Sequence, residues 1–170
     1  MLSVTSSAAL PSDVSGFGAA RHLRFGLLAR LARTGFPEGR EGDVEASLAV
    51  RCGIASPGHP FAEAAARAWA EAEVEVDSGP RDTRAQSRQI GAQWHGPELG
   101  ALRRPLLVLH GERDPILRVT AARATARAVD GARLVTFPGV GHDLPAALCP
   151  AIAGAVREPA ATAPAAEGRQ

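Results

Sequence analysis

The stretch "PLLVLHGERDP", from Pro105 to Pro115, decides the fold. Its four apolar residues, Leu106 to Leu109, form a run of the kind that is typical of a strand buried on both faces. The run stops at a Gly-Glu-Arg-Asp-Pro turn, so an acidic residue follows the end of the strand. A second stretch, "ARLVTFPGVGHDLP" from Ala132 to Pro145, repeats this plan with a histidine in its turn. The two stretches predict two buried strands, each followed by an ionisable side chain.

The segments around these strands predict how the two turns are related in space. "VTAARATARAV", residues 119–129, is typical of a short helix that Gly131 ends. A final helix is predicted over "LPAALCPAIAGAV", residues 144–156. Strand, helix, strand and helix in this order indicate parallel strands joined by a right-handed crossover. Because ligands of such sheets bind at the carboxyl ends of the strands, we expect Asp114 and His142 to be neighbours on one edge.

The chain before these strands is predicted to be helical, from about residue 17 to about residue 95. Apolar residues recur there at spacings of three and four, and Pro and Gly separate the segments. Helices are expected over residues 21–34, 42–54, 59–76 and 80–96. Asp43 is the predicted N-cap of the second helix. Phe61, Trp69 and Trp94 are predicted to pack in the interior of this helical block.

Composition excludes several functional classes. A chain of 170 residues predicts one domain, and its net charge of +1 favours neither nucleic acid nor an anionic membrane as a partner. No apolar run approaches the ~18 residues of a membrane span, and the N-terminus lacks the basic segment of a secretory signal, so a cytoplasmic location is expected. Cys52 and Cys149 predict free, buried thiols.

No cofactor or metal is expected. His22, His59 and His95 are scattered along the chain without the spacing of metal ligands. "GFGAAR" and "GVGHDL" begin like a dinucleotide fingerprint, but both lack its third glycine.

An aspartate and a histidine on one edge of a sheet are two parts of a nucleophile–base–acid system. The carboxylate orients the imidazole, whose other nitrogen then accepts a hydroxyl proton. Each residue alone also has a simpler interpretation, Asp114 as a turn residue or helix N-cap and His142 as a loop residue. Their order and spacing after two strands favour the pair. Glu112 and Asp143 are rival acids expected to point away from the turn tip. His110 is expected to be a packing residue or a residue that supports the site residues from behind.

Together, "PLLVLHGERDPIL" and "ARLVTFPGVGHDLP" resemble the C-terminal part of the α/β-hydrolase family. In that family the acid follows a strand in a Gly-x-x-Asp turn, and the histidine lies in a Gly-His turn after the last strand. The resemblance implies that Asp114 is the acid and His142 the general base of a Ser–His–Asp mechanism, acting on a small-molecule ester-like substrate. Among capped esterases, the chain is loosely similar to those like the aclacinomycin methylesterase.

The resemblance also implies a fold class and domain boundaries. The expected fold is α/β, a partial α/β-hydrolase fold with about three parallel strands, flanking helices and an inserted helical cap. The implied segments are a core strand at 1–12, a helical cap or lid at 13–100, the C-terminal hydrolase core at 101–157 and a disordered tail at 158–170.

The nucleophile of the family is missing from this sequence. Its Gly-x-Ser-x-Gly pentapeptide occurs nowhere, and "VSGFG" at Val14 to Gly18 fails because Asp13 stands where glycine is required. The loop that forms the oxyanion hole is missing too. We therefore expect a truncated hydrolase, inactive by itself, whose exposed strand edge favours self-association. Two alternatives stay open, a non-catalytic binding protein built on the remnant fold and another reaction of this fold, that of a dehalogenase or a cofactor-free haloperoxidase.

Overall fold

The computed structural model describes residues 21–76 and 98–162. The strand predicted at 1–12 and the helix predicted at 80–96, with Trp94, lie outside these residues. The described helices are α2 (Gly26–Arg33), α3 (Arg40–Ile54), α4 (Glu63–Glu75), α6 (Val119–Ala128) and α7 (Cys149–Thr162). The strands are β1 (Leu107–Gly111) and β2 (Arg133–Phe137), and two short 3₁₀ turns are η2 (Leu99–Ala101) and η3 (Ala146–Leu148).

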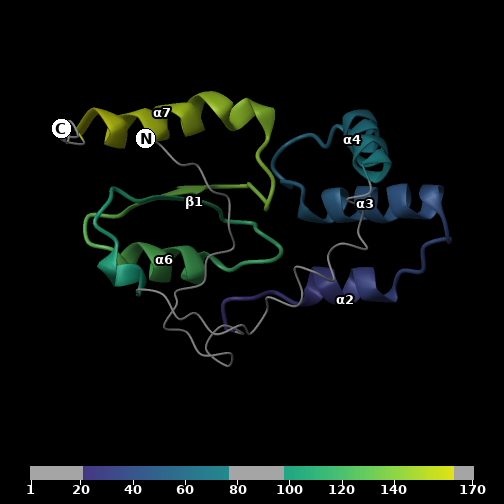
Figure 1. Ribbon diagram of the computed structural model, residues 1–170, viewed down its shortest axis with the longest axis horizontal. Coiled ribbons are helices and arrows are strands. Elements are labelled where there is room, and N and C mark those ends of the chain that lie inside the picture. The colour runs from purple at the N-terminus through teal and green to yellow at the C-terminus, as the bar shows by residue number, and fades with distance from the viewer. Residues whose placement is uncertain (1–20, 77–97, 163–170) are drawn as a thin grey trace.

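The strand–helix–strand–helix order predicted for the C-terminal half is confirmed. β1 and β2 pair in parallel, in a register that runs from Leu107 opposite Arg133 to Gly111 opposite Phe137. The crossover helix α6 packs against both strands, and α7 runs along the other side of the sheet (Figure 1). The chain therefore has an α/β fold with parallel strands, as the sequence indicates. Within the described residues the sheet holds two strands, where about three were predicted.

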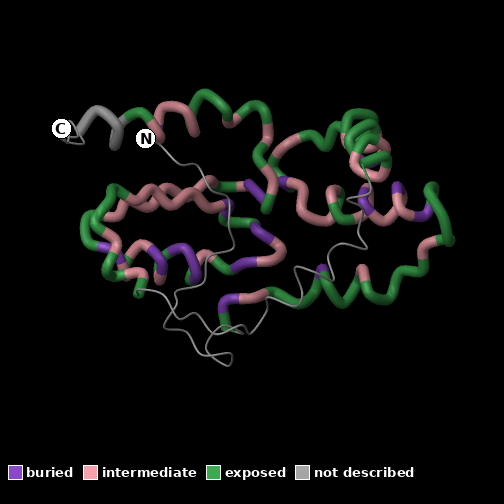
Figure 2. Tube along the Cα trace, viewed as in Figure 1, coloured by how far each residue is buried: buried purple, intermediate pink, exposed green. Residues whose placement is uncertain are grey.

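The strands are less buried than their apolar runs predict. Every residue of β2, and every residue of β1 except Gly111, is only partly buried. The most buried apolar side chains of this half lie on α6 and its flanks, among them Ala121 and Val129, and in the turn after β2, where Val140 is 2% exposed. The crossover helix carries several of these buried positions (Figure 2).

The helical block has a different interior from the one predicted. α3 and α4 pack together, and Val44 on α3 and Ala70 on α4 are fully buried. The prediction for the aromatic residues was wrong, because Phe61 is 39% exposed and Trp69 is 68% exposed. The reason is that α4 presents its small and polar face to α3, where Ser47 donates a hydrogen bond of 2.5 Å to Glu73.

Two local predictions are also corrected. Asp43 is not the N-cap of α3, because the helix begins at Arg40 after Gly39, whose φ of +92° suits glycine. The Asp43 amide instead donates to the Gly39 carbonyl. Cys52 and Cys149 are free thiols as predicted, but both are exposed.

At the C-terminal end, α7 extends to Thr162, into the first residues of the segment predicted to be a disordered tail. In the described part of the chain, no helix combines the length and the apolar character that crossing a bilayer would require.

Candidate active site

Two turns meet at the carboxyl edge of the sheet, one after β1 and one after β2. A Cβ placed on Gly111 would lie 2.1 Å from the carbonyl oxygen of Gly141, a separation that only a glycine tolerates. The backbone of the first turn is also bound to the second, since the Arg113 amide donates to the Val140 carbonyl at 2.8 Å. Glycine at position 111 therefore lets the two turns touch and brings their side chains into range.

Asp114 and His142 are in direct contact, as the sequence predicts. The Nδ1 of His142 lies 2.6 Å from Oδ2 of Asp114, and the Asp114 residue is only 3% exposed. The other carboxylate oxygen, Oδ1, accepts hydrogen bonds of 2.7 Å from the amides of Ile116 and Leu117. Asp114 thus holds the turn with one oxygen and orients the imidazole with the other.

The electrostatics of the pair favour the charged form of both groups. Burial by itself would raise the pKa of Asp114, but the hydrogen bonds from His142 and from the Leu117 and Ile116 amides outweigh it and lower the pKa. The hydrogen bond to Asp114 raises the pKa of His142 against the opposing effect of burial, and the charges of Asp114 and Asp143 raise it further. The pair therefore stabilises an imidazolium, the species that a general base forms when it accepts a proton.

The second nitrogen of this imidazole has no partner in the described part of the chain. No described residue forms a hydrogen bond with Nε2 of His142, and the side chain is 32% exposed whereas that of Asp114 is 4% exposed. A general base needs this arrangement, in which a buried carboxylate fixes one nitrogen and the other is left to accept a proton.

His110, the fourth residue of β1, has a pKa that the charges of both Asp114 and His142 influence. Burial lowers its pKa, the charge of His142 lowers it further, and Asp114 and a hydrogen bond with the Leu117 backbone act in the opposite direction. Its Nε2 is buried and has no partner among the described residues. The lowered pKa favours the neutral form of the His110 imidazole.

The two rival acids are occupied elsewhere. The carboxylate of Glu112 accepts a hydrogen bond of 2.8 Å from the Thr136 hydroxyl on β2, at an exposed position. Asp143 accepts a hydrogen bond from the hydroxyl of Ser56, in the loop after α3. Of the three carboxylates, only Asp114 contacts the ring of His142.

Sequence reasoning missed Ser56. It lies 87 residues before Asp143 in a Ser-Pro-Gly segment that predicts only a break between helices. Its buried hydroxyl donates to Asp143 and accepts a hydrogen bond of 2.9 Å from the Gly141 amide. Because this hydroxyl is committed to a carboxylate and not to the imidazole, Ser56 is not placed as a nucleophile. No local motif could have identified it.

Among the described residues, the other histidines form no metal site. His22 is buried and its Nδ1 lies 3.0 Å from the hydroxyl of Thr120, while burial and the nearby charges of Arg21 and Arg127 lower its pKa. Among the residues that the structure describes, no group of three or more His, Cys, Asp or Glu side chains is arranged to hold a metal ion.

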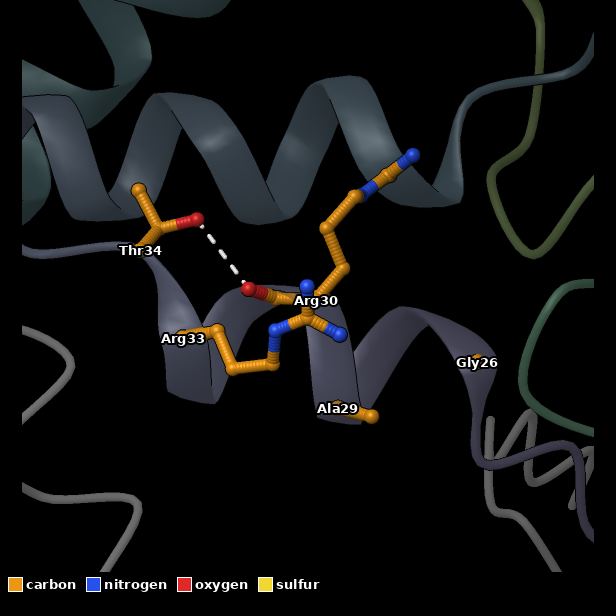
Figure 3. A pocket seen from close by; sticks show the side chains of 5 residues that line it. All are labelled: Gly26, Ala29, Arg30, Arg33 and Thr34. Carbon is orange, nitrogen blue, oxygen red and sulfur yellow. Dashed lines mark hydrogen bonds between the residues drawn. The ribbon is translucent and has the colours of Figure 1, made fainter.

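A surface hollow of about 470 Å³ lies away from the pair, along α2. It is lined by Gly26, Ala29, Arg30, Arg33 and Thr34, and the Thr34 hydroxyl donates to the Arg30 carbonyl at 3.1 Å (Figure 3). Neither Asp114 nor His142 lines it. The hollow is open and carries no group suited to ester chemistry, so the candidate site is the pair.

Comparisons with known proteins agree with this fold. The family model of TAP-like proteins, which are α/β-hydrolases, matches residues 62–158. Eleven chains of solved structures match as well. One is a crystal structure of the esterase RhEst1 from Rhodococcus sp. ECU1013, with 20% identity and a TM-score of 0.56. That match covers 80% of this chain and 48% of the esterase, so the chain spans about half the length of that relative. No curated protein matches.

Proposed function

We propose, from the premise that this chain belongs to the TAP-like family of α/β-hydrolases, that Asp114 and His142 are the acid and the general base of an ester hydrolase. The observation that carries the proposal is the 2.6 Å contact between Asp114 Oδ2 and His142 Nδ1, with Nε2 uncommitted among the described residues. The esterase character of a structural relative supports the choice of ester over other acyl substrates.

In the proposed reaction, Nε2 of His142 accepts the proton of a serine hydroxyl as the serine oxygen attacks the ester carbonyl carbon. The imidazolium is stabilised by the carboxylate of Asp114 and then gives its proton to the leaving alkoxide. A water molecule, activated by the same nitrogen, hydrolyses the acyl-enzyme. Because the pKa of His142 is raised, we expect the rate to increase with pH as this group loses its proton.

The serine itself is proposed to come from outside these 170 residues. The sequence holds no Gly-x-Ser-x-Gly pentapeptide, and the Ser56 hydroxyl is bound to Asp143. By the family's plan, a nucleophile turn and an oxyanion hole belong to strands that precede this part of the fold. The helical segment of residues 13–100 is proposed to cover the site as a cap, and the substrate is proposed to be a small-molecule ester.

The test begins with the coding DNA around this segment and ends with an assay. We expect an in-frame Gly-x-Ser-x-Gly pentapeptide upstream, and we expect the protein that contains it to hydrolyse a short p-nitrophenyl ester. Asp114→Asn should lower kcat by roughly 10⁴-fold, the loss seen when the orienting carboxylate of a serine protease becomes an amide. Glu112→Gln, which changes a carboxylate of the same turn that does not contact His142, should leave kcat unchanged.

Two results would contradict the proposal. The first is an encoded protein without any nucleophile turn and without esterase activity, which would favour the non-catalytic binding protein. The missing pentapeptide is the observation on which that second candidate rests. The second is an active protein that loses nothing when His142 is replaced by Ala, since its activity would then arise elsewhere.

A further inference from the structure

We propose that Ser56 is a positioning residue for His142, a role that rests on the proposed function. Its hydroxyl forms hydrogen bonds with the residues on both sides of the histidine, Gly141 and Asp143. It accepts from the amide of Gly141 at 2.9 Å, and it donates to the carboxylate of Asp143. Ser56 is 3% exposed, so water does not compete for these bonds. One buried side chain thus holds both ends of the three-residue segment that presents the imidazole.

The backbone around Ser56 reinforces the same contact. The carbonyl of Ile54 accepts a hydrogen bond of 2.9 Å from the His142 amide, and the Gly58 amide donates to the Gly139 carbonyl at 2.8 Å. A Cβ on Gly141 would lie 2.5 Å from the Ile54 carbonyl oxygen, so the two segments are in close contact. Residues 54–58, which begin at the last residue of α3, therefore run alongside residues 139–143, and the helical block fixes the turn that carries His142.

The chemistry of the hydroxyl explains why serine suits this position. It donates one hydrogen bond and accepts another at the same time, which neither alanine nor the ammonium group of lysine can do. Without it the buried amide of Gly141 would lose the acceptor that the described residues provide, and the carboxylate of Asp143 would lose a donor. Among the described residues, the charges of Asp114 and Asp143 raise the pKa of His142, and the charge of His142 lowers the pKa of His110. Ser56 therefore holds the segment in which the ring of His142 meets Asp114.

A double-mutant cycle measured by histidine NMR tests this role in the 170-residue chain. The pKa of His142 is titrated in wild type and in Asp114→Asn, and the difference measures the coupling between the two side chains. The same difference is then measured with Ser56→Ala present in both proteins. We expect the coupling to fall by roughly half or more in the Ser56→Ala background, because the ring then meets Asp114 for a smaller fraction of the time.

The matched control is Ser47→Ala. Ser47 is also a buried serine that donates to a carboxylate, that of Glu73, but between α3 and α4 and away from the His142 turn. This variant should lose comparable stability and keep the full coupling. Ser56→Thr, which retains the hydroxyl, should also keep it.

The outcomes separate the two proposals. Full coupling in the Ser56→Ala background would overturn the role of Ser56 and leave the Asp114–His142 pair intact. No coupling in the wild-type background would refute the pair itself, and both proposals with it. Should Ser56→Ala not fold, hydrogen exchange of the wild-type protein decides the matter. The Gly141 amide should be protected, and exchange at the rate of an unstructured amide would overturn the proposal.

Discussion

At the scale of single residues, Asp114 holds its turn and contacts His142 at the same time. The sequence allows it to be either a turn residue or the partner of His142. In the structure, Oδ1 accepts the two turn amides and Oδ2 contacts the imidazole. The turn amides are themselves a cause of the lowered pKa, because they stabilise the carboxylate. The turn therefore prepares the acid for its partner.

This arrangement predicts a pH-dependent contribution to stability. Folding raises the pKa of His142 above 6.5, so its contribution is fully present below that value and is lost as the pH rises through the folded pKa. Folding lowers the pKa of Asp114 below 3.8, so its contribution is present above that value and is lost as the pH falls through the folded pKa.

The measurement is urea unfolding of wild type and Asp114→Asn across pH. The difference in free energy of unfolding should be larger at about pH 5.5 than at about pH 9. Glu112→Gln serves as the control, and its difference in free energy of unfolding from wild type should be no larger at the lower pH. If the difference in free energy of unfolding between wild type and Asp114→Asn instead increases steadily toward high pH, the prediction is contradicted.

At the scale of elements, the site depends on two turns that approach more closely than side chains allow. Gly111 ends β1 against the backbone of Val140 and Gly141, and Gly141 lies against the end of α3. Two apolar strands can pair in parallel without such a close approach of the turns that follow them. The glycines therefore govern whether the two strand ends form one site.

We predict that Gly111→Ala lowers the free energy of unfolding by roughly 1–3 kcal/mol, because its Cβ would overlap the Gly141 carbonyl and force the turns apart. Gly154→Ala in α7 is the matched control. A Cβ there meets nothing within 4 Å, so the change should raise the stability by roughly 0.5–1 kcal/mol through helix propensity. Urea unfolding followed by circular dichroism measures both. Equal effects of the two substitutions would mean that the turns are not tightly packed.

At the scale of the whole molecule, a small parallel sheet and a helical block are joined at the turn edge. The contacts that join them include backbone hydrogen bonds, such as the one from the Arg118 amide to the His22 carbonyl. They also include the Ser56 hydrogen bonds and the contact between His22 Nδ1 and the Thr120 hydroxyl. Several large apolar side chains remain exposed, among them Trp69, Val76 and Leu144 at 68–73%. Within the described part, β1 has a hydrogen-bonded neighbour on one side only. An unpaired strand edge and exposed apolar groups both favour association.

We therefore predict that the 170-residue chain self-associates, and sedimentation velocity over a range of concentrations measures it. Trp69→Gln distinguishes the two causes. If association occurs mainly through the strand edge, Trp69→Gln should associate as strongly as wild type. If it occurs mainly through the exposed apolar side chains of the helical block, Trp69→Gln should associate more weakly. A concentration-independent monomer would contradict the prediction.

The sequence by itself determined the elements of the C-terminal half and the meeting of Asp114 with His142. Apolar runs of strand length and helical periodicity are local properties, and a crossover connection leaves parallel strands with their carboxyl ends together. Asp114 and His142 follow those ends in the chain, so their meeting could be derived without coordinates.

Only the tertiary structure decided the role of Ser56, the exposure of Trp69 and the commitment of Asp143. Each depends on which element packs against which, and Ser56 and Asp143 are 87 residues apart. Periodicity shows that a helix has an apolar face, but not which neighbour covers it. On α4 the small and polar face packs against α3. Helix propensities are local, so they do not specify which face of a helix packs against its neighbour.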